Sequence, residues 1–193
     1  MSVHHIATLR TAIVPRSTIT SKVALVCGGV AFLAVMAQIS LPIPGSPVPV
    51  TGQTLAVLLL GAAYGANLGA TTLFAYLSIG VAGAPIFAQG THGWSRVYGA
   101  TGGYLVGMVI TSYLVGYLAE RKWDQRIATV IPTMILGNVV TFSLGLFWLH
   151  QYTGQGWAWT FSAGLSPFIL GEVIKIAIAS TALPSVWRFV SKR

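Results

Sequence analysis

The chain has 193 residues, of which 54% are hydrophobic and only 7% are Asp, Glu, Lys or Arg. Soluble domains carry about 25% charged residues, so this chain lacks the charge needed to cover a surface in water. A soluble globule is therefore excluded. The composition predicts one all-α integral membrane domain.

The first apolar segment follows a basic leader. Residues 1–21 are expected to be a cytoplasmic polar leader, and residues 22–40 are expected to form the first helix. A secretory signal peptide is the alternative for residues 1–40, because signal peptides also have a basic region followed by an apolar one. The apolar segment, of about 18 residues, exceeds the usual 7 to 15 and has no A-x-A cleavage pattern after it, which favours a membrane span.

The next part of the chain must contain several spans. No charged residue occurs between Lys22 and Arg96, a run far longer than the roughly 20 residues that one helix needs to cross a bilayer. Proline and glycine turns divide the apolar sequence at 41–49, 65–69, 83–85 and 152–156. The six expected helices cover 22–40, 53–65, 68–83, 100–119, 127–149 and 165–187. The second and third are short for complete spans.

The basic residues indicate how these helices are oriented. With six spans, nine of them share one side, namely Arg10, Arg16, Lys22, Arg121, Lys122, Arg126, Arg188, Lys192 and Arg193. The other side carries Arg96 alone, and Lys175 lies within a helix. By the positive-inside rule both termini are predicted to be cytoplasmic, with residues 22–187 as the membrane domain and 188–193 as a basic tail. Since orientation accounts for the excess charge, no nucleic-acid partner is expected.

The sequence offers little for metal or bond-making chemistry. Its single cysteine, Cys27, cannot form an internal disulfide or a multi-thiolate site, and no histidine has an acidic or thiol neighbour at ligand spacing. No metal and no cofactor is therefore expected. No GxxxxGK[ST] phosphate loop occurs, so work driven by ATP would need a partner subunit. Glu120 and Asp124 are expected on a solvated loop.

The last span contains the most informative pair of residues. Glu172 and Lys175 lie in a predicted membrane helix, where buried charges are costly and by default indicate a functional site. Their spacing of i and i+3 places both on one helix face. They can therefore grip a ligand together, or, as the alternative, form an ion pair that only locks helix packing.

Other polar side chains are expected at a similar depth. Counting about 1.5 Å per residue, Glu172 and Tyr76 lie roughly 10 Å from the outer ends of their helices and Asn138 about 16 Å, while Gln53 opens the second helix. These groups can form one pocket in the outer half of the membrane, although each can also bridge helices.

The first helix carries small residues at spacings of three and four. Ala24, Cys27, Gly28, Ala31 and Ala34 form a smooth face that permits close approach of another helix, either within the fold or from a partner. We take Ala24, Gly28 and Ala31 as the candidate partner interface.

Several stretches together resemble a known family. They are PVTGQTLAVLL at 49–59, Leu68-Gly69-Ala70, Tyr76-Leu77, GAPIFA at 83–88, TGGYLVG at 101–107, Gly137-Asn138 and PFILGEVIK at 167–175. In this order they resemble the signature segments of the BioY family, the biotin-specific substrate-capture subunits of energy-coupling factor (ECF) transporters. The resemblance covers about residues 24 to 182.

The resemblance implies a six-helix ECF S-component-like bundle in a prokaryotic cytoplasmic membrane, with an outward-facing biotin pocket. It also implies a transmembrane coupling subunit and two ABC-type ATPase subunits as partners. Within its motifs, Thr51, Gly102 and Gly103 become further candidate ligand contacts. Two departures are Glu172, where the family more often has Asp, and Gly52, where a non-glycine is commoner.

The chemistry of biotin suits these residues. Its ureido ring has two N–H donors and one carbonyl acceptor, so Glu172 can accept from the ring while Lys175 or Asn138 donates to it. Tyr76, Phe87 and Tyr104 can supply an apolar wall for the rest of the ligand. The ligand carboxylate has Lys175, Arg96 and loop amides as alternative partners.

Three other functions stay open at this point. The scaffold can serve another vitamin, which would need a pocket for a different ring. An intramembrane enzyme would use Glu172 as a base, but no nucleophile or second acid accompanies it. A structural assembly subunit would keep the charged pair for packing alone. We expect a non-enzymatic biotin-uptake subunit.

Overall fold

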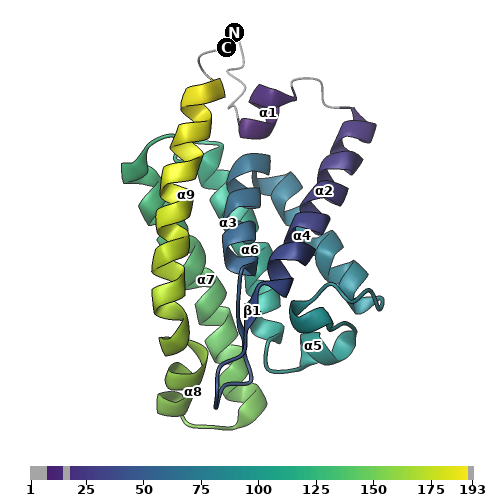
Figure 1. Ribbon diagram of the computed structural model, residues 1–193, viewed down its shortest axis with the longest axis vertical. Coiled ribbons are helices and arrows are strands. Elements are labelled where there is room, and N and C mark those ends of the chain that lie inside the picture. Colours follow the sequence, from purple (N-terminus) through teal and green to yellow (C-terminus); the bar gives the residue numbers. More distant parts are fainter. Residues whose placement is uncertain (1–7, 15–17, 191–193) are drawn as a thin grey trace.

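The computed structural model describes residues 8–14 and 18–190, and these residues form a bundle of helices that run along one long axis (Figure 1). The helices are α1 (Leu9–Ile13), α2 (Ile19–Gln38), α3 (Gln53–Tyr64), α4 (Ala66–Val81), α5 (Trp94–Tyr98), α6 (Gly102–Ala119), α7 (Ile127–Thr153), α8 (Trp157–Gly164) and α9 (Ile169–Val190). Two short 3₁₀ turns, η1 (Ala88–Gly90) and η2 (Ser166–Phe168), and an antiparallel pair of two-residue strands, β1 (Ser40–Leu41) and β2 (Val50–Thr51), complete the described elements.

Each of the six expected segments coincides with a helix. The sixth begins later than expected, at Ile169, because Pro167 and the 3₁₀ turn η2 separate it from α8. Four helical segments of the described chain are long and apolar enough to cross a membrane: Ile19–Gln38, Gly102–Ala119, Ile127–Thr153 and the combined Trp157–Val190. Helices α3 and α4 are shorter apolar helices, in agreement with the sequence.

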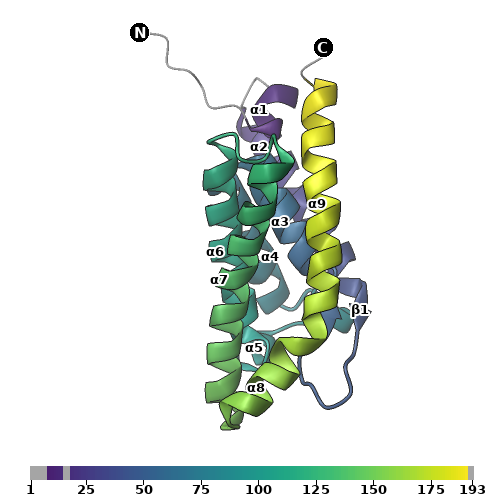
Figure 2. The ribbon, with the colours of Figure 1, turned by 90° about the vertical axis from the view of Figure 1, so that its left-hand side faces the viewer.

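The core lies where α3, α4, α6 and α7 meet. Helix α6 packs against α3, α4 and α7, and α9 closes the bundle against α7 and α3. Helix α2 covers α4 and α3 from one side but is mostly exposed along its length. Figure 2 shows α6 and α7 side by side, with α9 crossing next to α7. This arrangement leaves a common space between the starts of α3, α6 and α9 and the later half of α7.

Charged side chains gather at one end of the bundle. The start of α2, the loop between α6 and α7, helix α1 and the end of α9 all lie at that end (Figures 1 and 2). They carry Arg10, Lys22, Arg121, Lys122, Arg126 and Arg188. Arg96 belongs to α5, in the opposite half. Arg16, Lys192 and Arg193 lie outside the described residues.

The expectation of a solvated loop is wrong for Asp124, while Glu120 is half-buried. Asp124 is fully buried, and its Oδ2 accepts a hydrogen bond of 2.5 Å from Nε1 of Trp187 on α9. Burial raises the pKa of the Asp124 carboxyl to about 6. Glu120 Oε1 accepts from the Ala66 backbone N–H at 3.0 Å and so caps the start of α4. Both carboxylates therefore tie loops to helices at this end.

The described part of the leader also belongs to the bundle. Leu9 of α1 is 5% exposed and packs in a core cluster with residues of α3, α7 and α9, among them Leu58, Met134 and Leu183. Helix α1 thus seals the basic end of the bundle. Residues 9–13 therefore pack on the helical bundle, whereas the sequence predicts a polar leader there, outside the membrane domain.

The charge distribution gives a topology prediction. A reporter fused after Arg193 and a tag inserted at 120–126 should both be cytoplasmic, because basic loops are retained on that side. A tag at 154–156 should be accessible from outside. Labelling with an impermeant reagent in intact cells measures all three. If the first two positions fell on opposite sides, the six-span arrangement would be rejected.

Candidate ligand cavity

A cavity lies between the end of the β1–β2 loop, the loop after α4 and the outer ends of α6, α7 and α9. Its volume is about 50 Å³. Cavities that hold small-molecule ligands commonly measure about 300 to 1,000 Å³. The cavity is therefore nearly closed in this structure, and its lining must move when a ligand enters.

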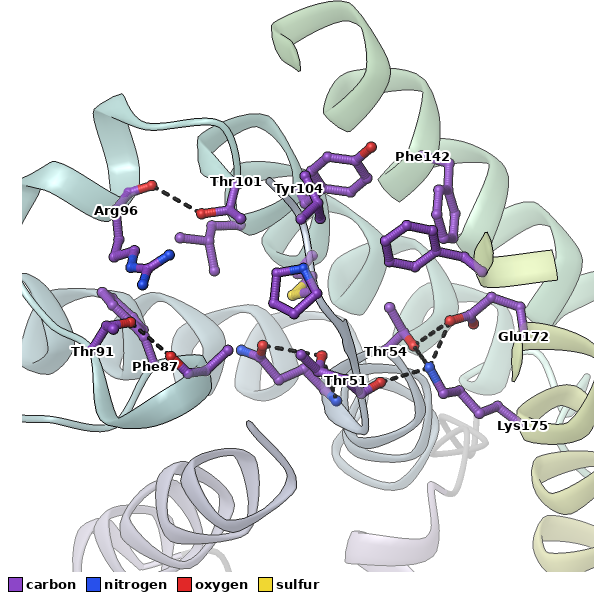
Figure 3. Close-up of a pocket in the computed structure, with 17 residues that line it drawn as sticks. Thr51, Thr54, Phe87, Thr91, Arg96, Thr101, Tyr104, Phe142, Glu172 and Lys175 are labelled. Atoms are coloured by element: carbon purple, nitrogen blue, oxygen red, sulfur yellow. Dashed lines mark hydrogen bonds and ion pairs between the residues drawn. The ribbon is translucent and has the colours of Figure 1, made fainter. Parts of the chain in front are cut away.

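The charged pair on α9 forms one end of this cavity (Figure 3). Lys175 Nζ lies 2.7 Å from Glu172 Oε1, and their side chains are 12% and 8% exposed. The same Nζ donates to the Thr51 carbonyl at 2.6 Å and to Thr54 Oγ1 at 2.8 Å. Its three N–H donors thus have three acceptors, which is the condition for burying an ammonium group.

The Glu172 carboxylate also accepts hydrogen bonds from neighbouring helices. Thr54 donates its hydroxyl proton to Glu172 Oε1 at 2.7 Å, and Asn138 Nδ2 donates to Glu172 Oε2 at 3.0 Å. Glu172 also lies in the first turn of α9, where the helix dipole favours a negative charge. Asn138 Oδ1 is buried without a hydrogen-bond partner among the described residues. The predicted residues Asn138 on α7, Glu172 and Lys175 on α9 and Thr51 on β2 therefore meet at one point.

A second polar branch lies behind the cavity wall. Gln53 Nε2 donates to Tyr76 Oη at 2.9 Å, and the Tyr76 hydroxyl donates to the Ile86 carbonyl at 2.8 Å. Thr51 Oγ1 donates to Gln53 Oε1 at 3.2 Å. Tyr76 is only 1% exposed and does not line the cavity, whereas Gln53 and Thr51 do. Tyr76 therefore supports the wall instead of forming it.

Four aromatic rings build the apolar walls. Phe87 comes from the loop after α4, and Tyr104, Phe142 and Phe168 pack together with ring centroids 5.5 to 6.4 Å apart. The Tyr104 hydroxyl donates to the Gly164 carbonyl at 2.9 Å, so its polar end is already satisfied. Phe87 and Tyr104 were predicted from the sequence, but Phe142 and Phe168 were not.

Arg96 lines the end of the cavity opposite the charged pair, as Figure 3 shows. Its guanidinium has no hydrogen bond or ion pair with another described residue. Its backbone N–H donates to the Gly93 carbonyl at 3.3 Å, and its carbonyl accepts from the Thr101 hydroxyl at 3.2 Å. The side chain is half-buried. The cavity thus has an ion pair at one end, an unpaired cation at the other and an apolar middle.

Gly102 and Gly103 lie outside this cavity. They face Trp148 and Leu144 on α7, where a Cβ on Gly103 would overlap the Trp148 side chain and the Leu144 carbonyl, and a Cβ on Gly102 would overlap the Val97 carbonyl. Their lack of a side chain lets α6 and the preceding loop approach α7. The expectation that they contact a ligand is therefore not met by the structure.

The small-residue face of α2 points away from the bundle. Ala24, Gly28 and Ala31 are exposed, and a Cβ on Gly28 would meet nothing within 4 Å. Gly29, in contrast, is buried against Thr72 and Tyr64. Ala24, Gly28 and Ala31 therefore lie on the exposed side of α2.

The arrangement suits binding more than catalysis. Among the described residues, no group of three or more His, Cys, Asp or Glu side chains is placed to hold a metal ion. The cavity instead offers a carboxylate and an ammonium to a polar ring, aromatic walls to an apolar body and a guanidinium to an anion.

Comparison with known proteins agrees with this description. A model of the BioY family matches residues 7–192, nearly the whole chain. The chain belongs to the BioY family. A Lactococcus lactis protein named biotin transporter BioY2 is 32% identical over 157 residues, which are 81% of this chain and 84% of that protein. A Pyrococcus horikoshii protein named probable biotin transporter BioY is 34% identical, over 82% of this chain and 91% of its own. These BioY relatives are named as transporters, not as enzymes.

A solved structure has the same fold. The crystal structure of the S-component for biotin from an ECF-type ABC transporter superposes with a TM-score of 0.78, covering 90% of this chain and 95% of that one at 22% identity. The expected S-component-like bundle is thus confirmed for this member of the BioY family.

Three residues of the cavity were not predicted from the sequence. Thr54 both accepts from Lys175 and donates to Glu172, and Phe142 and Phe168 form part of the wall. Thr54 and Phe168 could have been suspected, because they stand in the two motifs at 49–59 and 167–175 that also contain Gln53 and Glu172. Nothing in the sequence distinguished Phe142, because an aromatic residue within an apolar span is unremarkable in a membrane protein.

Proposed function

We propose that this chain captures biotin on the outer side of a prokaryotic cytoplasmic membrane, as the substrate-binding subunit of an ECF-type transporter. It performs no bond chemistry and needs no cofactor, and partner subunits hydrolyse ATP. The observation that carries the proposal is the cavity, which has the Glu172 and Lys175 pair at one end and, at the other, Arg96, whose guanidinium has no partner among the described residues. The names of the relatives and of the solved structure support it.

The two polar ends match the two polar ends of biotin. The Glu172 carboxylate accepts from the ureido N–H groups, and Asn138, whose Nδ2 has a second N–H beside the one bonded to Glu172, donates to the ureido carbonyl. The thiophane ring and the alkyl chain pass along the aromatic walls. Arg96 binds the carboxylate, because all three Lys175 donors already have acceptors while the Arg96 guanidinium has none among the described residues.

Titration calorimetry on the detergent-purified chain tests this function. Biotin should bind saturably at one site, and biotinamide, which lacks the negative charge, should bind more weakly. Arg96→Leu should reduce biotin affinity while removing the preference for biotin over biotinamide. Absence of biotin binding by the unsubstituted chain would reject the function. A preference that persists in Arg96→Leu would place the carboxylate elsewhere.

For the partners we propose a transmembrane coupling subunit that docks on α2, together with two ABC-type ATPase subunits. The exposed residues Ala24, Gly28 and Ala31 supply a face on which another helix can pack closely. The face is also free of side-chain contacts at Gly28. Both properties suit a surface that the subunit does not need for its own fold.

Neighbouring glycines provide a matched test of this interface. Gly28→Leu should weaken complex formation with the coupling subunit, because it separates the helices, yet leave biotin affinity and ligand-free stability unchanged. Gly29→Leu should instead destabilise the isolated chain, since its Cβ would lie 2.5 Å from Thr72 Cγ2. Co-purification and thermal unfolding measure the two effects. Loss of stability in Gly28→Leu would contradict the assignment.

A further inference from the structure

The last residue of α2 is bonded to the loop that walls the cavity. Gln38 Nε2 donates to the Phe87 carbonyl at 3.1 Å, and Gln38 Oε1 accepts from the Gly90 backbone N–H at 2.9 Å. Nε2 also donates to the Ala34 carbonyl, within α2, at 3.1 Å. One side-chain amide thus joins α2 to two backbone groups about fifty positions further along the chain.

The segment held in this way has an uncommon backbone. Gln89 has φ of 61° and Gly90 has φ of 67°, so two successive residues adopt the left-handed conformation, which a residue with a side chain rarely takes. Phe87 and Thr91 pair as an isolated antiparallel bridge on either side of the turn. The Gln38 amide binds the turn at both ends, before Gln89 and directly after it, and so helps to keep this conformation.

The turn determines where one cavity wall stands. Phe87 is 2% exposed and lines the cavity together with Ala88. Its ring meets Tyr76 edge-on, with centroids 5.5 Å apart, and it packs so closely on Gly80 that a Cβ there would overlap the ring. Because Gln38 binds the carbonyl of Phe87 itself, a change in that bond moves the residue that forms the wall.

We propose that Gln38 is a positioning residue for biotin: it ties α2 to the Phe87 wall, so that retention of the ligand depends on the position of α2. The inference rests on the proposed function. Helix α2 is suited to transmit a displacement, since it is mostly exposed, with Ala24, Gly28 and Ala31 all on its exposed side. A shift of its Gln38 end loosens the turn and opens the wall.

Gln38→Met tests the tie, because methionine has a similar length but makes neither hydrogen bond. Loss of the two bonds that hold the wall predicts a fall in biotin affinity of about tenfold, which corresponds to about 1.4 kcal/mol. Most of the change should be faster dissociation, since the wall retains bound ligand. Gln155→Met, in an exposed outer loop, is the matched control and should behave as the unsubstituted chain.

A double-mutant cycle separates positioning from general stabilisation. If Gln38 acts through Phe87, then Gln38→Met should cause little further loss of affinity in a Phe87→Ala background. Ligand-free melting temperature should fall only slightly in Gln38→Met, because both bonds lie at the exposed end of α2. Lower melting temperature with an unchanged dissociation rate, or full additivity with Phe87→Ala, would overturn the inference. Failure of the unsubstituted chain to bind biotin would instead reject the proposed function.

Discussion

Glu172→Gln is expected to weaken biotin binding at least about a hundredfold while the protein remains folded. Removing one partner of a buried ion pair typically costs about 3 to 5 kcal/mol, and every 1.4 kcal/mol is about tenfold in dissociation constant. Glutamine keeps the shape and one acceptor but gives up the charge that strengthens hydrogen bonds from the ureido N–H groups. It also leaves Lys175, 2.7 Å away, without its counter-charge.

Two further variants show which property of the carboxylate matters. Glu172→Asp, which restores the commoner family residue, should retain measurable binding, with any deficit caused by the shorter reach. Lys175→Met should lose affinity comparably to Glu172→Gln, because Glu172 then keeps an uncompensated charge. Calorimetry and thermal unfolding should be measured on the same preparations.

The alternative of a pair that serves only helix packing predicts a different pattern. The pair is fully hydrogen-bonded to Thr51, Thr54 and Asn138, as a structural lock would also be. In that case Glu172→Gln and Lys175→Met would lower the melting temperature of the ligand-free chain, while the folded fraction bound biotin normally. Unchanged biotin affinity in both variants would reject the assignment of this cavity as the biotin site.

Gly103→Ala is expected to destabilise the fold strongly. A Cβ at this position would overlap the Trp148 side chain and the Leu144 carbonyl of α7, and a backbone carbonyl cannot turn aside as a flexible side chain can. Overpacking of this kind costs about 3 kcal/mol or more when backbone must move, which corresponds to roughly 10 °C in melting temperature for a chain of this size.

Gly156→Ala is the matched control for that substitution. Gly156 precedes α8 with φ of −64°, and a Cβ there would meet nothing within 4 Å, so its melting temperature should change little. The fraction of Gly103→Ala that stays folded should bind biotin with ordinary affinity. Normal stability combined with lost affinity would return Gly103 to the ligand site that its motif suggested.

The charged residues of the site could be predicted because placing a charged side chain in a membrane span costs free energy. A carboxylate and an ammonium three residues apart in an apolar span indicate a function by themselves, since hydrocarbon does not tolerate them unpaired. Asn138 and Gln53 could be assigned to the same site from their estimated depth in the membrane alone. Tyr76 could be placed near the site but not behind its wall, because depth along a helix does not indicate which way a side chain faces.

The sequence by itself determined the membrane class, the six helical segments and the accumulation of basic residues at one end. These follow from local hydropathy and charge, because the bilayer selects on each segment separately. Only the tertiary structure decided that Thr54 bridges Glu172 and Lys175, that Arg96 faces the cavity and that Gly102 and Gly103 do not. Those facts depend on how helices approach and rotate against one another, and such contacts join residues as far apart as Thr54 and Glu172, 118 positions along the chain. No local pattern contains that information, since close packing is a property of several helices together.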